Sequence, residues 1–114
     1  MVILIVDDSA ELRRVIRDVL AGVDAELHEC ASAEEAFAFG VEASDWVLMD
    51  IELNGLDGIS ATRIIRSRSP GTKVCIVTNH DHARLRREAQ QAGACAFVSK
   101  QDLLELPSVL GSLI

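Results

Sequence analysis

The chain has 114 residues, of which 49% are apolar and 25% are charged, and its formal net charge is −7. This length suits one domain, residues 1–114, and is too short for two. The negative charge argues against direct nucleic-acid binding by this domain, which would need a basic surface. No apolar run approaches the roughly 20 residues that span a bilayer, and the short apolar N-terminus is unlike a signal peptide.

The number and spacing of the cysteines favour a reducing, cytoplasmic compartment over a metal site or a disulfide. Cys30, Cys75 and Cys95 form an odd set without CxxC spacing. This usage is typical of reduced, buried thiols in a cytoplasmic protein.

The first half of the chain alternates strand-like runs with helical periodicity. A strand over residues 2–6 is followed by a helix that Ser9 can cap and Gly22 ends. A second strand near residues 25–30 precedes a short helix, which opens with a capping-box sequence at 32–35 and stops by Gly40.

The same alternation continues to the C-terminus. A third strand (45–50) leads through a turn-rich loop into a helix from about residue 59, which Ser69-Pro70-Gly71 breaks. A fourth strand (73–78), a polar helix (81–92) and a fifth strand (95–99) follow. The tail is helical in pattern, and Pro107 must lie in a first turn or produce a kink.

Five strands alternating with five helices predict an α/β fold of three layers, a parallel sheet covered by helices on both faces. The common flavodoxin-like, doubly wound strand order is 2-1-3-4-5, which makes strands 1 and 3 neighbours at the topological switch point. Ligands bind at that point, beyond the carboxyl ends of the strands.

Acidic residues end the two strands that this order brings together. Asp7 and Asp8 follow strand 1, and Asp50 follows strand 3. Three carboxylates in one pocket repel each other until a divalent cation or a proton neutralises them. Thr78 and Lys100 end strands 4 and 5 at the same edge. This set suits an Asp nucleophile that attacks a phosphoryl donor with the help of a cation and fixed donors.

The sequence here resembles the receiver domain of two-component response regulators, of the chemotaxis-regulator kind. The resemblance covers the whole chain. The matching residues are Asp7-Asp8, Asp50, Leu56-Asp57-Gly58, Thr78, Phe97 and Lys100.

The resemblance implies a phosphorelay function. Asp50 would be the phosphoacceptor, with Lys100 and Thr78 as its catalytic partners. Mg²⁺ would be held by Asp7, Asp8, Asp50 and the backbone carbonyl of Glu52. The donor would be a phosphohistidine on a sensor histidine kinase or a histidine phosphotransfer protein. Catalysis would be limited to self-phosphorylation and autodephosphorylation.

The resemblance also implies a switch. Thr78 would swing toward the phosphoryl group while Phe97 turns inward, which would reshape the face of helix 4, strand 5 and helix 5. That face would bind a downstream target or an attached output domain, and homodimer formation on phosphorylation stays open.

Several positions depart from the family pattern. Asn54 stands where a proline is usual, so the loop after Asp50 is expected to be less rigid. Asn79 stands where a small residue is common and would narrow the route to the phosphate. Gln101 replaces the proline that commonly follows the lysine, which argues against a cis peptide there. Glu52, two residues after Asp50, places an acid at the pocket mouth, and His80 lies two residues after Thr78; both are expected to tune the phosphoryl lifetime.

Other whole-protein hypotheses remain. The chain could be the N-terminal receiver of a DNA-binding transcriptional regulator, for which the abrupt apolar end at Leu113-Ile114 argues. A phosphohydrolase of the haloacid dehalogenase type would want Asp-x-Asp after strand 1, whereas Asp7 and Asp8 are adjacent. A docking module that works without phosphorylation would need a missing site residue, and none is missing.

Simpler interpretations apply to single residues. Asp7-Asp8 alone could be a turn that caps the next helix, and Asp57-Gly58 is expected to be only a turn. Trp46 is expected to pack in the core, and His28 and His82 to lie on the surface.

Overall fold

The computed structural model describes residues 1–112 and contains one five-stranded sheet. All neighbouring strands are parallel, and their order is β2-β1-β3-β4-β5, as the alternation of elements predicts. The strands are β1 (Val2–Val6), β2 (Glu26–Cys30), β3 (Trp46–Met49), β4 (Lys73–Thr78) and β5 (Ala96–Ser99).

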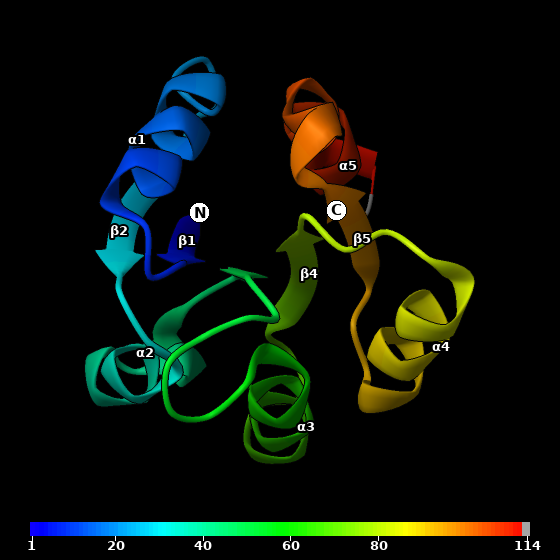
Figure 1. The fold of residues 1–114 in the computed structure, drawn as a ribbon. Coiled ribbons are helices and arrows are strands. Elements are labelled where there is room, and N and C mark those ends of the chain that lie inside the picture. The colour runs from blue at the N-terminus through cyan, green and yellow to red at the C-terminus, as the bar shows by residue number, and fades with distance from the viewer. Residues whose placement is uncertain (113–114) are drawn as a thin grey trace.

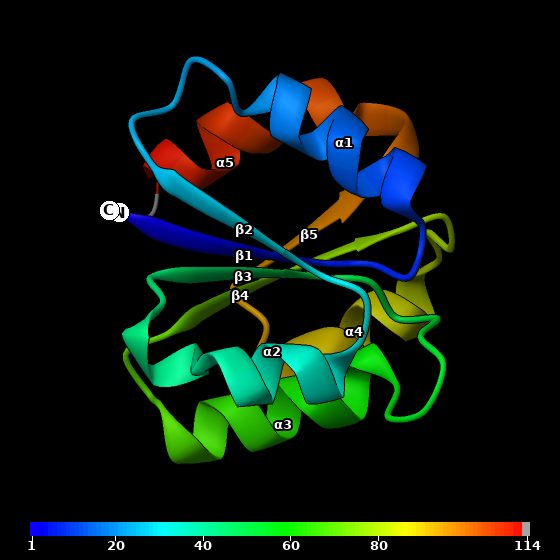
Figure 2. The ribbon, with the colours of Figure 1, turned by 90° about the vertical axis from the view of Figure 1, so that its left-hand side faces the viewer.

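Five α-helices cover the two faces of this sheet. They are α1 (Ala10–Val19), α2 (Ala33–Phe39), α3 (Gly58–Arg68), α4 (Ala83–Ala92) and α5 (Leu106–Ser112). Short 3₁₀ helices, Val41–Ala43 and Lys100–Glu105, precede β3 and α5. Figures 1 and 2 show α1 and α5 on one side of the sheet and α2, α3 and α4 on the other. Within residues 1–112, every helix is too short or too polar to cross a bilayer.

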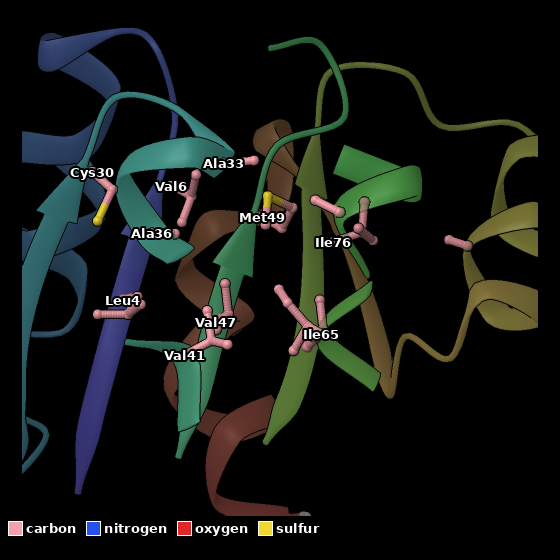
Figure 3. Close-up of a cluster of buried hydrophobic side chains, with 13 residues drawn as sticks. Leu4, Val6, Cys30, Ala33, Ala36, Val41, Val47, Met49, Ile65 and Ile76 are labelled. Atoms are coloured by element: carbon pink, nitrogen blue, oxygen red, sulfur yellow. The ribbon is translucent and has the colours of Figure 1, made fainter. Parts of the chain in front are cut away.

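The central strands are apolar without interruption because both of their faces are buried. In β1, Leu4 and Val6 point into a cluster under α2 and α3, part of which Figure 3 shows, while Ile3 and Ile5 point into a second cluster under α1 and α5. Trp46 belongs to the second cluster and is 1% exposed, which confirms its packing role. Apolar burial on both faces therefore fixes the register of the strands that carry the site.

The starts of α1 and α2 have the expected caps. Ser9 accepts a hydrogen bond from the Leu12 amide, and Ser32 accepts one from the Glu35 amide. The Glu35 side chain reaches back to the Ala31 amide, one residue before the cap. Since Ser9 supplies the cap of α1, the alternative in which Asp7 or Asp8 caps that helix is wrong.

Some boundaries and environments differ from the predictions. Helix α4 begins at Ala83 instead of residue 81, because the exposed His82 side chain caps it by accepting from the Leu85 amide. His28 is half-buried, with its ring centroid 4.4 Å from that of Phe39. Cys95 is exposed, so the prediction of three buried cysteines is wrong at this position. The residue directly precedes β5, where a turn from α4 brings it to the surface.

The C-terminal prediction is confirmed as far as the structure describes the chain. Pro107 lies in the first turn of α5, where its missing N–H costs no helical hydrogen bond. Leu113 and Ile114, on which the argument for a longer regulator drew, lie outside the described residues.

Candidate functional site

Three carboxylates meet at the carboxyl edge of the sheet. Val6 and Met49 are paired across β1 and β3, so Asp7 and Asp50 leave neighbouring strands side by side. Ligand oxygens of Asp7, Asp8 and Asp50 all lie within 4.8 Å of one another. Asp7 is 2% exposed and Asp50 is 5% exposed, whereas Asp8 is open to solvent. Two of the three charges are therefore shielded from water.

A lysine partly neutralises the buried pair. The Lys100 Nζ atom lies 2.8 Å from Asp7 Oδ2 and 3.2 Å from Asp50 Oδ2. Burial is the largest single influence on the Lys100 ammonium and by itself would lower its pKa. The hydrogen bond to Asp7 and the charge of Asp50 together outweigh burial, so the net result is a pKa above the ordinary value. Lys100 is therefore a fixed positive charge at neutral pH.

The Asp50 carboxyl experiences opposing influences. Burial raises its pKa above the ordinary value, the Lys100 charge opposes the rise, and the Asp7 charge adds to it. With all three carboxylates ionised, one ammonium leaves two negative charges uncompensated. Asp7 Oδ2 is buried, and its close partner is the same Lys100 ammonium that Asp50 shares. The oxygen ligands and the residual charge fit a hard divalent cation such as Mg²⁺.

The backbone holds the acids in place. The Asp7 amide donates to Cys30 O at 3.1 Å, and the Asp50 amide donates to Val6 O at 3.0 Å. Asp7 Oδ1 accepts from the Ser9 amide at 2.9 Å, which closes a tight turn into α1. The strand ends and this turn set the direction of the two buried carboxylates.

Thr78 ends β4, the strand that neighbours β3, and the loops after β3 and β4 form the mouth of the pocket. Thr78 is fully buried at the end of β4, and its hydroxyl accepts from the His80 amide at 3.3 Å. The His80 imidazole Nε2 contacts the Glu52 carboxylate, so the loop after β3 and the loop after β4 are joined. Both of these side chains are exposed.

Phe97 lies in β5, three residues before Lys100, and its side chain faces α4. Its ring is half-buried, and the Arg86 guanidinium stands 4.5 Å from the ring centroid. Arg86 also donates to Asp81 at 2.6 Å and lines, with Phe97 and Cys95, a cavity of about 290 Å³ between α4 and β5. The contact of Arg86 with Phe97 has no counterpart in the sequence analysis, because Arg86 is there only one residue of the polar helix predicted over 81–92.

Gly58 has a role that the sequence did not reveal. A Cβ atom at this position would lie 1.9 Å from the Asp50 carbonyl oxygen. The Gly58 amide donates to Ile51 O at 3.0 Å, so the start of α3 lies directly against the backbone of Asp50. The prediction that Asp57-Gly58 is only a turn is therefore incomplete, since the glycine also permits this close approach.

The unusual residues leave the pocket intact. Asn54, Asn79 and Gln101 are all exposed, and residues 1–112 contain no cis peptide. The loop around Asn54 is held from α2, where Glu34 Oε2 accepts from the Leu56 amide at 3.2 Å.

Comparison with known proteins identifies the family. The model of the response regulator receiver domain matches residues 3–110. The chain belongs to this family. The transcriptional activator protein ExaE of Pseudomonas putida is 37% identical over 103 residues, which cover 88% of this chain and 48% of that protein. The transcriptional regulatory protein ResD of Bacillus subtilis is 33% identical over 99 residues, which cover 86% of this chain and 41% of that protein.

Solved structures agree with the fold. A two-component response regulator of the LuxR family from Aurantimonas sp. SI85-9A1 superposes with a TM-score of 0.90 at 32% identity, covering 98% of this chain and 83% of that chain. A CheY-like receiver domain protein from Methanospirillum hungatei gives 0.87 at 25% identity, with coverages of 98% and 91%. The chain spans less than half the length of the two curated relatives above.

Proposed function

We propose that Asp50 accepts a phosphoryl group from a phosphohistidine on a sensor histidine kinase or a phosphotransfer protein. The observation that carries this proposal is the convergence of three carboxylates within 4.8 Å beside one shared ammonium. An ionised carboxylate at the end of β3 is the nucleophile, and it needs no general base.

The transfer exchanges one bond for another. A lone pair of an Asp50 oxygen forms a bond to phosphorus while the bond from phosphorus to the donor imidazole nitrogen breaks, and the imidazole retains that electron pair. Asp7, Asp8, Asp50 and the Glu52 carbonyl would hold Mg²⁺, which when bound offsets charge on the phosphoryl oxygens. Lys100 supplies a fixed positive charge to those oxygens, and the Thr78 hydroxyl supplies a hydrogen bond.

Output follows from the same residues. Lys100 must exchange part of its contact with Asp50 for the phosphoryl oxygens, and Thr78 must turn its hydroxyl toward them. Phe97 lies three residues before Lys100 on the strand between α4 and α5. A change at the strand end thereby alters the face of α4, β5 and α5 that binds a partner.

The Glu52–His80 contact bears on the lifetime of the phosphoryl group. The two side chains meet between the loops that follow β3 and β4, at the mouth of the pocket. Their contact restricts the approach of water to Asp50. His80→Ala is expected to speed hydrolysis by up to about fivefold, the range that a contact between two exposed polar side chains supports. Exposed His82 gives a matched control, since it caps α4 and contacts no site residue.

The test is the intact mass of the protein after incubation with Mg²⁺ and a small-molecule phosphodonor. We expect a gain of one phosphoryl group that disappears without Mg²⁺ and is absent from Asp50→Asn. No gain in wild-type protein that still binds Mg²⁺ would favour a docking module that works without phosphorylation.

A second candidate is a receiver that controls an output domain in a longer protein. The curated relatives are about twice as long as this chain or longer, and two of them are transcriptional regulators. The chemistry at Asp50 would be the same, but the partner would be an output domain of the same polypeptide and not a separate protein. Phosphorylation-dependent binding to a separately expressed protein would distinguish the diffusible switch from this arrangement.

A further inference from the structure

The turn that carries Asp7 and Asp8 is held from behind by an arginine. Arg13, in the second turn of α1, donates from Nη1 to the backbone carbonyl of Asp7 at 2.6 Å. Its Nε donates to Glu29 Oε1 on β2 at 3.0 Å, and its side chain is 16% exposed. One guanidinium therefore ties a helix, a strand and the acidic turn together.

Glu29 fixes the orientation of that guanidinium. Arg17, one turn further along α1, donates to the other Glu29 oxygen at 3.0 Å and to Leu27 O at 3.3 Å. Burial raises the pKa of Glu29, but the hydrogen bonds from Arg17 and Arg13 outweigh it and hold the pKa below its ordinary value. Arg17 shares the carboxylate, but its contacts lie on β2 and not on the acidic turn.

The Asp7 carbonyl matters because of the residue that follows it. Asp7 has its own restraints, since Oδ1 accepts from Ser9 and Oδ2 faces Lys100. Asp8 is exposed, and its carboxylate has no hydrogen bond or ion pair within residues 1–112, yet it shares the pocket. The position of this carboxylate is therefore set by the backbone, and first by the peptide between residues 7 and 8. Arg13 holds the oxygen of that peptide.

We propose that Arg13, oriented by Glu29, is the positioning residue of the cation site. It fixes the peptide between Asp7 and Asp8 so that the Asp8 carboxylate points into the pocket. This inference rests on the proposed function, because it assumes that the pocket takes a divalent cation. The proposal predicts that Arg13 strengthens Mg²⁺ binding, whereas its positive charge alone would weaken Mg²⁺ binding.

The test is Mg²⁺ affinity, measured by titration calorimetry on the metal-free full chain. Arg13→Ala is expected to weaken binding about tenfold or more, the range in which groups behind metal ligands contribute. Arg13→Lys is expected to weaken it similarly, because an ammonium lacks the planar fork that serves two acceptors at once. Arg17→Ala is the matched control, with a change within about twofold, since it removes a more exposed contact to the same carboxylate.

The outcomes separate this inference from the proposed function. Failure of wild-type protein to bind Mg²⁺ or to gain mass at Asp50 would count against the proposed function itself. With a functional wild type, Arg13→Ala protein that binds Mg²⁺ as tightly as Arg17→Ala protein, or more tightly than wild type, would overturn the positioning role. Wild-type affinity in Arg13→Lys would overturn the part given to Glu29. Thermal unfolding without metal identifies any variant that fails to fold, in which case Arg13→Lys carries the test.

Discussion

Replacing Gly58 with alanine tests whether the backbone of the site is as tightly packed as the structure indicates. The added Cβ would lie 1.9 Å from the Asp50 carbonyl oxygen, 2.8 Å from the Asp50 carbonyl carbon and 2.9 Å from Ile51 Cα. All three atoms belong to the backbone, so no side-chain rotation relieves the clash. The start of α3 and the end of β3 must separate by roughly an ångström, because real Cβ atoms essentially never come within 3.0 Å of such atoms.

Two consequences of this separation can be measured. Overpacking of this kind lowers the free energy of unfolding by about 1–3 kcal/mol, which urea denaturation would detect. A displacement of about 1 Å at Asp50, the proposed nucleophile, is expected to cost on the order of 100-fold in rate, which the rate of mass gain from a phosphodonor would report.

A glycine without close neighbours provides the control for this substitution. Gly111 lies in α5, and a Cβ there would meet nothing within 4 Å. Gly111→Ala is expected to raise stability by roughly 0.5–1 kcal/mol through helix propensity and to leave phosphorylation unchanged. Wild-type stability and rate in Gly58→Ala protein would refute the reasoning, because they would show that the two backbones are not in contact.

Three further predictions concern Lys100, Asp57 and the cysteines. Lys100→Ala protein should still take up some phosphoryl group. Phosphorylation of the wild type is expected to change amide hydrogen exchange over α4 and β5, and the variant should lack this change, because the shared ammonium of the pocket is gone. The wild-type change in exchange in the phosphorylated variant would contradict this. Asp57→Ala should lower the free energy of unfolding by about 1 kcal/mol, because Asp57 caps α3 by accepting from the Ile59 and Ser60 amides. The bond to Ser60 contributes most to holding the pKa of Asp57 below its ordinary value of 3.8. The contribution of Asp57 is therefore full above that pH and lost as the pH falls toward the lowered folded value, and urea titrations of Asp57→Asn protein should lack this loss. A maleimide should label Cys95, which is exposed, and not Cys75, whose pKa burial raises to about 12; a label on Cys75 under native conditions, located by mass spectrometry of its peptide, would contradict its burial.

The fold was predictable because its signals are repeated and local. Each central strand is a continuous apolar run that only a doubly covered parallel strand explains, and helical periodicity separates each run from the next. Boundaries were less certain where a side chain competes for the helix end. His82 is an uncommon cap, so the start of α4 was placed too early. The exposure of Cys95 depends on how the turn after α4 presents the chain, which no local pattern encodes.

The acidic pocket was predictable for a different reason. Parallel strands end at one edge of the sheet, so polar residues that follow adjacent strands meet without any knowledge of side-chain packing. Contacts between residues that only the folded structure brings together could not be predicted from the sequence. The approach of Gly58 to Asp50 and the hydrogen bond of Arg13 to Asp7 join residues that no spacing rule connects. Both act on the backbone of an acidic residue, which residue types alone cannot show.

The charges in the pocket connect the site to the proposed partner face of α4, β5 and α5. Asp7 and Asp50 are nearly inaccessible to water, and one ammonium lies between them, 2.8 Å from the first and 3.2 Å from the second. Removing one partner of such a buried pair typically costs about 3–5 kcal/mol, so the position of Lys100 responds strongly to any change in charge at Asp50. Lys100 begins the 3₁₀ helix that leads from β5 into α5, and Phe97 lies three residues before it under Arg86. Under the proposed function, a phosphoryl group on Asp50 would add negative charge where the ammonium already has two acceptors. Lys100, which joins the pocket to β5 and α5, would then be the residue that moves.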